Sequence, residues 1–155
     1  MKKWLLIILG FFILIQFIRI DQEKPKIDYG KDFTSNNATP ATIKTLVKRS
    51  CYACHSFETT YHWYANVAPV SWWIKDHVNE GREYINFSTW EDYSNEEKAR
   101  KLMNSVAYIK PDQMPLTTYV SQHPEAKLSN DEKEFLVEWM TKEAEKYYPE
   151  LKKDK

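Results

Sequence analysis

The 155-residue sequence is poor in glycine and cysteine and has no excess of either charge. Its three glycines, Gly10, Gly30 and Gly81, lie far apart, which excludes P-loop and Rossmann fingerprints because both cluster glycines where phosphate meets the backbone. Lys and Arg total 22, as do Asp and Glu, so the charge balance gives no case for nucleic-acid binding. Two cysteines in a chain of this length also exclude a disulfide scaffold.

Aromatic residues are abundant, at 15% of the chain, with six Trp and ten Tyr. They provide enough flat apolar surface for a dense core or for a pocket around a large flat ligand. The length suits one domain, and the sequence shows no internal repeat or low-complexity segment.

The N-terminus carries a basic pair, Lys2 and Lys3, followed by an apolar run. From Trp4 to Ile20 this run has 17 residues, or about 25 Å of helix. No small-residue cleavage site follows, so the pattern favours an uncleaved transmembrane signal anchor over a cleaved signal peptide. The basic pair then places the remaining chain on the periplasmic side of the inner (cytoplasmic) membrane.

Composition and the positions of prolines, glycines and helix-capping residues divide the rest of the chain into parts. The predicted parts are an anchor at 1–20, a polar linker at 21–39, a folded domain at 40–148 and a charged C-terminal tail at 149–155. No period-two strand pattern occurs in the domain, which we predict to be all-α with long irregular connections. Its four predicted helices begin at Pro40 after Thr39, at Ser71 (ending near Gly81), at the capping box Ser94/Glu97 and at the capping box Ser129/Glu132.

The chemistry is concentrated at Cys51-Tyr52-Ala53-Cys54-His55, which holds both cysteines. Cys-x-x-Cys-His is the signature of covalent c-type haem attachment. On one helical turn the two thiols share a face and can each form a thioether, and the imidazole of His55 lies on the same side. Two alternatives stay open: a thioredoxin-like redox pair, and a zinc site completed by His62 and His77.

A distal iron ligand would distinguish an electron carrier from an open reactive site. Met114 lies in a non-helical loop between Pro111 and Pro115, and prolines reduce the conformational freedom of a loop. His77, on an apolar-rich helix, is either a second candidate ligand or a structural histidine. The full set of candidates is Met103, Met114, Met140, His62, His77 and His123.

The chain resembles the class I cytochromes c and, more closely, the cytochrome c-like "haem-binding domain" family of small membrane-anchored bacterial proteins. The resemblance covers about residues 43–141. Two positions depart from the pattern, His62 where proline is expected and Leu116 where a second proline often follows Met-Pro. The matching segments are Cys51 to Ser56, Trp63 to Trp73, His77 to Arg82, Asn86 to Trp90, Met114-Pro115 and His123 to Ser129.

The resemblance implies one haem c, attached through Cys51 and Cys54, with His55 as proximal and Met114 as distal ligand. It also implies that the Pro69 carbonyl orients the proximal imidazole. Haem carboxylates need donors where they are partly buried. The plausible donors are Trp72, Trp73, Arg82, Trp90 and Tyr119.

The sequence therefore predicts a cytochrome c-like all-α domain that follows a transmembrane helix. Its expected function is that of a monohaem c-type cytochrome passing single electrons to redox partner proteins of the cell envelope. A five-coordinate haem enzyme, a gas or redox sensor, a cytochrome with His77 as distal ligand and a haem module docked in a larger membrane complex remain alternatives.

Overall fold

The computed structural model describes residues 1–36 and 38–152, which contain helices and no β-strand, in agreement with the predicted helical class. Linker residue 37 and tail residues 153–155 lie outside the described residues. The α-helices are α1 (Lys2–Ile15), α2 (Ala41–Ser50), α3 (Tyr52–His55), α4 (Val70–Tyr84), α5 (Asn95–Ile109), α6 (Thr117–Gln122) and α7 (Asn130–Tyr147). Short 3₁₀ helices are η1 (Phe33–Ser35), η2 (Trp63–Asn66), η3 (Phe87–Asp92), η4 (Pro124–Ala126) and η5 (Pro149–Lys152).

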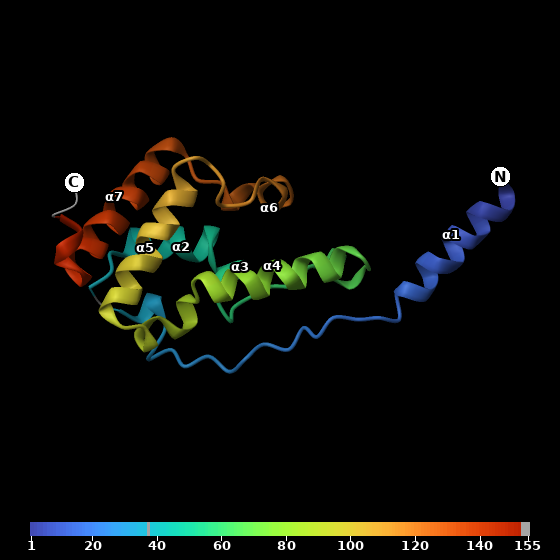
Figure 1. The fold of residues 1–155 in the computed structure, drawn as a ribbon, viewed down its shortest axis with the longest axis horizontal. Coiled ribbons are helices and arrows are strands. Elements are labelled where there is room, and N and C mark those ends of the chain that lie inside the picture. Colours follow the sequence, from blue (N-terminus) through green and yellow to red (C-terminus); the bar gives the residue numbers. More distant parts are fainter. Residues whose placement is uncertain (37, 153–155) are drawn as a thin grey trace.

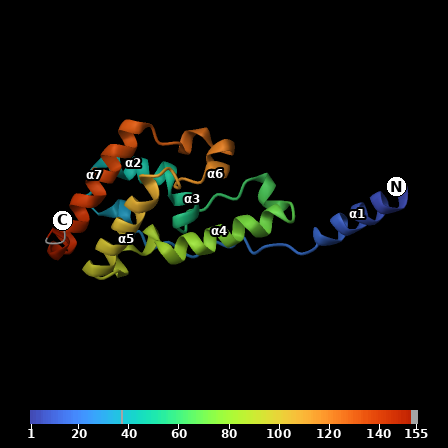
Figure 2. The same ribbon diagram turned by 45° about the horizontal axis from the view of Figure 1, so that its top comes forward.

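The helices form a body with one long projection. Helices α5 and α7 pack side by side, α2 lies against them, and α4 runs outward from this body (Figure 1). Beyond the free end of α4 lies α1, and an extended chain returns from α1 along α4 to the body (Figure 2). The short helix α3 packs against α4, which places residues 52–55 beside the middle of the molecule.

Local sequence signals place most helix starts correctly. Both predicted capping boxes form, with Ser94 and Ser129 each accepting from the backbone N–H of the glutamate three residues later. Helix α2 begins at Ala41, with Pro40 as its N-cap. Helix α4 begins before the predicted Ser71, at Val70, and continues past Gly81 to Tyr84 because tertiary packing outweighs the weak helix propensity of glycine.

The core is centred on Trp90, which has no exposed surface. Its ring meets Phe33 edge-on at 5.3 Å between centroids, and it also contacts Tyr93 and Tyr147. Phe33 comes from the segment predicted as a linker, and it is only 1% exposed. The core therefore also takes in chain that precedes the predicted domain boundary at residue 40.

Helix α1 corrects the predicted membrane topology. It has 14 residues and therefore a length of about 21 Å, against roughly 30 Å for a bilayer core. Among the described residues no helix is both long and apolar enough to cross a membrane. The transmembrane helix predicted for residues 1–20 is therefore wrong, and so is the single-pass inner-membrane location based on it.

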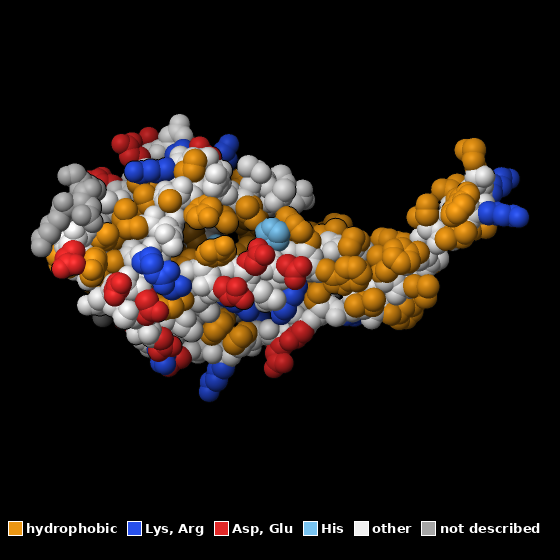
Figure 3. Space-filling view, in the orientation of Figure 1, with side chains coloured by type: hydrophobic (Ala, Val, Ile, Leu, Met, Phe, Trp, Pro, Cys, Tyr) orange, Lys and Arg blue, Asp and Glu red, His pale blue; other side chains and the backbone are white. Residues whose placement is uncertain are grey.

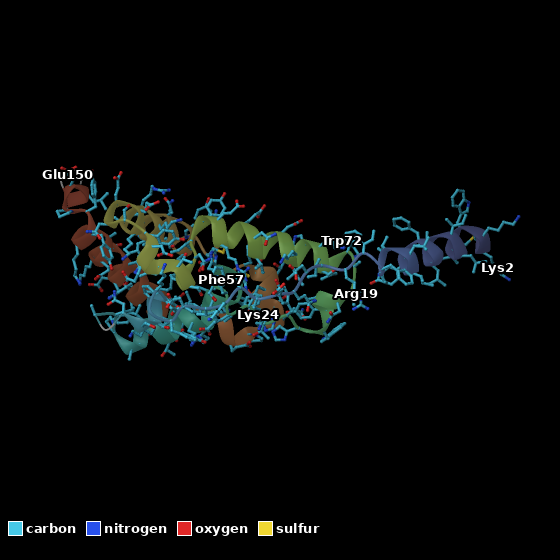
Figure 4. All side chains as sticks on the ribbon, turned by 90° about the horizontal axis from the view of Figure 1, so that it is seen from below. Lys2, Arg19, Lys24, Phe57, Trp72 and Glu150 are labelled. Carbon is cyan, nitrogen blue, oxygen red and sulfur yellow. The ribbon has the colours of Figure 1, made fainter. Side chains whose placement is uncertain are left out.

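The physical reason for the early end of α1 is a set of contacts with the body. The side-chain amide of Gln16 bonds both to the carbonyl of Ala68 (3.0 Å) and to its N–H (2.9 Å). The indole of Trp72 donates to the Ile18 carbonyl at 2.9 Å, and Lys75 donates to the Asp21 carbonyl at 2.8 Å. Figure 4 shows Trp72 at the end of α4 that meets this segment, with Lys2 at the far end of α1. Residues after 15 therefore bind the folded body rather than extend the helix.

An ion pair joins the helix before the Cys-x-x-Cys-His motif to the C-terminal helix. Arg49 of α2 lies 2.9 Å from Glu132, the acidic member of the α7 capping box. The hydrogen bond from Arg49, followed by that from the Ser129 backbone, lowers the pKa of Glu132 from its ordinary 4.5 to about 2. A depressed carboxyl pKa stabilises the fold above the unfolded value, and this contribution is lost as the pH falls through the folded value.

We expect the Glu132→Gln variant to lose less thermal stability than the wild type between about pH 5 and pH 2, because glutamine keeps the cap but does not titrate. Thermal unfolding followed by circular dichroism measures the two midpoints across this range. Glu134→Gln, at an exposed position on α7, is the matched control, and its unfolding midpoint should change with pH as that of the wild type does. If the unfolding midpoints of wild type and Glu132→Gln fell in parallel with pH, the lowered pKa of Glu132 would be contradicted.

Candidate functional site

The Cys-x-x-Cys-His motif forms one helical turn. The backbone N–H of His55 donates to the Cys51 carbonyl at 2.9 Å, so both cysteines and the histidine project from the same short helix. Both cysteines are free and partly buried. Burial, and to a lesser extent the neighbouring Cys54, raises the pKa of Cys51 to about 12. A thioredoxin-like pair needs a lowered thiol pKa, so this environment does not favour that alternative.

The imidazole of His55 is oriented by the backbone of α4. Its Nδ1 lies 2.7 Å from the Gly81 carbonyl and 3.2 Å from that of Ile85, so Nδ1–H is the donor and Nε2 is left without a proton. Burial lowers the pKa of His55, which favours the neutral imidazole that a metal requires. The Pro69 carbonyl, predicted to hold the ring, instead accepts from the backbone of Trp72 and Trp73 at the start of α4.

Close approach of α3 and α4 depends on Gly81. A Cβ atom at this position would lie 3.0 Å from the Cys54 carbonyl oxygen and 3.3 Å from Cε1 of His55. Only glycine therefore leaves the imidazole and the carbonyl at hydrogen-bond distance without moving either helix.

Arg82, the next residue on α4, fixes the chain that follows the motif. Its Nε donates to the Ser56 carbonyl at 2.9 Å and its Nη2 donates to the Thr59 hydroxyl at 3.1 Å. The guanidinium also lies over the Phe57 ring, 5.3 Å from its centroid. Arg82 thus holds the backbone on the C-terminal side of His55, which is a positioning role.

Three adjoining cavities surround the motif, and Figure 3 shows a hollow lined by hydrophobic side chains. We call them the outer, central and inner cavities, of about 290, 200 and 250 Å³. Cys54 faces the outer and central cavities, whereas Cys51 and His55 face the central and inner ones. The Tyr61 hydroxyl, in the outer cavity, is buried with no hydrogen-bond partner. Contiguous apolar space, thiols at its wall, a neutral imidazole and an unpaired polar atom fit a flat macrocycle such as haem.

Met114 lines both cavities that His55 lines. Its loop is fixed by two backbone bonds to the Tyr108 carbonyl, from Gln113 at 3.0 Å and from Met114 at 3.1 Å. Asp112 takes a left-handed conformation (φ 60°) and binds Lys133 of α7 at 2.8 Å. The thioether is therefore presented on the same side of the molecule as His55 by a well-anchored turn.

The other candidate iron ligands differ in whether their side chains are already hydrogen-bonded or buried in the core. His77 lines the central cavity, and its Nδ1 donates to the Trp73 carbonyl at 2.9 Å, which leaves Nε2 available. His123 has hydrogen-bond partners at both ring nitrogens. Met140 is 1% exposed in the core beside the inner cavity, and Met103 packs against the core. Among the described residues no three His, Cys, Asp or Glu side chains gather as a metal site, which does not support the zinc alternative.

The residues predicted to donate hydrogen bonds to the haem carboxylates do not lie together. Trp73 and Tyr119 line the cavities. Trp72 is bonded to the segment after α1, and Trp90 lies in the core away from the cavities. Gly81 was not predicted as a site residue, although a glycine inside a helix, here four-fifths of the way along α4, is costly enough to have signalled a close contact.

We expect Gly81→Ala to destabilise the domain by up to about 2 kcal/mol. Overpacking against a backbone carbonyl costs roughly 1–3 kcal/mol and exceeds the gain of about 1 kcal/mol in helix propensity. Urea unfolding measures the difference. Gly10→Ala is the control, because nothing lies within 4 Å of its added Cβ. Equal stability of Gly81→Ala and the wild type would show that α3 and α4 are not tightly apposed.

Comparison with known proteins bears on the same residues. No curated protein and no solved structure matched the chain. A family model described as a haem-binding domain matches residues 10–142, which include the motif, the cavities and Met114. The chain belongs to this family of haem-binding domains.

Proposed function

We propose that this protein is a monohaem c-type cytochrome that carries single electrons. In this proposal Cys51 and Cys54 attach the haem through thioethers, and His55 and Met114 are the axial ligands. The observation that carries it is the His55 imidazole, whose Nδ1–H is bound to the Gly81 carbonyl while the ring lines the two cavities that Met114 also lines. The haem iron, when bound, supplies the one-electron chemistry.

The chain's own residues prepare the site for that role. Burial favours the neutral form of the His55 imidazole, the Gly81 carbonyl orients the ring, and Arg82 holds the backbone that follows it. The cavity walls are mostly apolar, and a neutral thioether ligand favours the reduced, less charged state of an iron centre. Redox proteins that exchange single electrons are the proposed partners.

A second candidate is a cytochrome with His77 as the distal ligand. His77 lines the central cavity together with His55, and the bond from its Nδ1 to Trp73 leaves Nε2 free. A thioether and an imidazole impose different potentials and spectra, so the two candidates are separable by experiment. If neither side chain binds iron, an open coordination position points to a haem enzyme or sensor.

Covalent attachment is tested on protein produced in a host that matures c-type cytochromes. We expect haem to stay with the polypeptide through acid-acetone extraction and denaturing electrophoresis, because thioethers survive both treatments. Cys51→Ala should leave a single thioether and reduce the amount of haem that stays with the polypeptide. Ser50→Ala, at a position outside the motif, should leave this amount unchanged. Free extraction of haem from the wild type would contradict the proposal.

Distal ligation is tested by comparing Met114→Ala with His77→Ala. The ferric wild type should be low-spin with the weak near-infrared sulfur-to-iron band. Met114→Ala should abolish this band and lower the midpoint potential, since each 59 mV is about 1.4 kcal/mol of preference for the reduced state. His77→Ala should keep the band.

The opposite pattern would establish His77 as the ligand. A high-spin wild type would favour the enzyme or sensor. Absorption spectra in both redox states and a potentiometric titration decide among these outcomes.

A further inference from the structure

A buried histidine outside the proposed ligand set lies beside the outer cavity. His123, between α6 and η4, is only 7% exposed. Its Nε2 lies 2.6 Å from the Tyr64 hydroxyl, and its Nδ1 lies 3.1 Å from Oε1 of Glu125. A carboxylate only accepts, so Nδ1–H donates to Glu125, and in the neutral ring Nε2 accepts from the Tyr64 hydroxyl. We call these three residues the Tyr64–His123–Glu125 relay.

The relay can bind a proton without losing a hydrogen bond. When Nε2 is protonated it donates to the Tyr64 oxygen, and the hydroxyl proton of Tyr64 rotates away. Glu125 then pairs with the imidazolium. Burial raises the pKa of Tyr64, with smaller contributions from Cys54 and Glu125, so Tyr64 remains a phenol in both states. Both protonation states of His123 are therefore satisfied by the same heavy atoms.

The relay lies next to the wall of the candidate haem site. Tyr64 lines the outer cavity, and Tyr119, stacked on His123 at 4.5 Å between centroids, lines the outer and central cavities. The His62 ring lies 4.4 Å from that of His123 and also faces the outer cavity. From α2, Arg49 donates to the Lys127 carbonyl at 3.4 Å, next to η4. These groups and the relay itself are the titratable and charged neighbours that the structure places around His123.

We propose that His123 is a proton-binding site coupled to the redox state of the haem, an inference that rests on the proposed function. His123 takes up one proton from solvent when one electron from a single-electron donor reaches the iron, and it releases the proton on oxidation. One N–H bond forms at Nε2 of His123 on reduction and breaks on oxidation, no other covalent bond changes, and the charge added by the electron is balanced by the charge of the proton.

Electrostatics across an apolar cavity provides the coupling. Reduction removes one positive charge from the site, so a cation at His123 is repelled less, and in a water-poor surround this interaction is weakly screened. Linkage is reciprocal: the proton must favour the electron as much as the electron favours the proton. The midpoint potential therefore falls as the pH rises through the titration of His123.

The experiment is a potentiometric titration of the holoprotein at several pH values, followed by absorption. One proton per electron changes the ratio of reduced to oxidised protein, at fixed ambient potential, by up to about tenfold per pH unit. We expect His123→Gln to abolish this dependence. Glu125→Gln, at an exposed side chain, should move it to lower pH because the imidazolium loses its carboxylate partner. Glu125→Gln thus carries the test if His123→Gln does not fold.

Two further variants serve as controls. Tyr29→Phe removes a hydroxyl from an exposed side chain that belongs neither to the relay nor to the walls of the three cavities, and should keep the pH dependence. His62→Asn should also keep it, whereas its loss in this variant alone would assign the proton to His62 and overturn the proposal. A pH-independent potential, or a dependence that survives His123→Gln, overturns it too. A preparation that binds no haem overturns the proposed function instead, so the two failures are distinguishable.

Discussion

The hydrogen bond between Nδ1 of His55 and the Gly81 carbonyl is the contact on which the arrangement of the site depends. It joins a helix of a single turn to the last turn of a long one, and neither partner alone specifies the orientation of the imidazole. Burial lowers the pKa of His55 and so favours the neutral ring, whereas the Gly81 carbonyl, which only accepts, fixes Nδ1 as the protonated nitrogen. The bond therefore selects the tautomer and direction that a metal-binding imidazole needs.

The rest of the fold supports this contact from both sides. Helices α5 and α7 build a core around Trp90, and the capping boxes at Ser94 and Ser129 set where these helices begin. Arg49, two residues before the motif, is tied to the first turn of α7. Displacement of α3 would therefore strain the core as well as the site. Met114 gains its place from the same framework, because its loop is bonded to the end of α5 and to α7.

The outer cavity differs from the motif in having several polar side chains at and beside its wall. Beside this wall His123 is hydrogen-bonded to Tyr64 and Glu125, whereas the hydroxyl of Tyr61, a residue that lines the cavity, has no partner. Buried polar networks are retained where every member is paired in each state that the protein adopts. His123 meets this condition beside the candidate haem site, because it stays paired with or without its second proton.

Sequence alone determined the Cys-x-x-Cys-His motif and much of the local structure. The spacing of Cys51, Cys54 and His55 on one turn, the all-helical class and both capping boxes follow from interactions between residues at most four positions apart. Only tertiary structure decided that α1 ends where Gln16 meets Ala68, and that Gly81 rather than Pro69 supplies the carbonyl for His55. It also placed Trp90 in the core instead of at the cofactor cavity. These outcomes depend on pairs of residues 26 or more positions apart, such as Gln16 with Ala68 and His55 with Gly81. Local propensity and spacing carry no information about which distant backbone groups meet, because that choice is made by packing the whole chain.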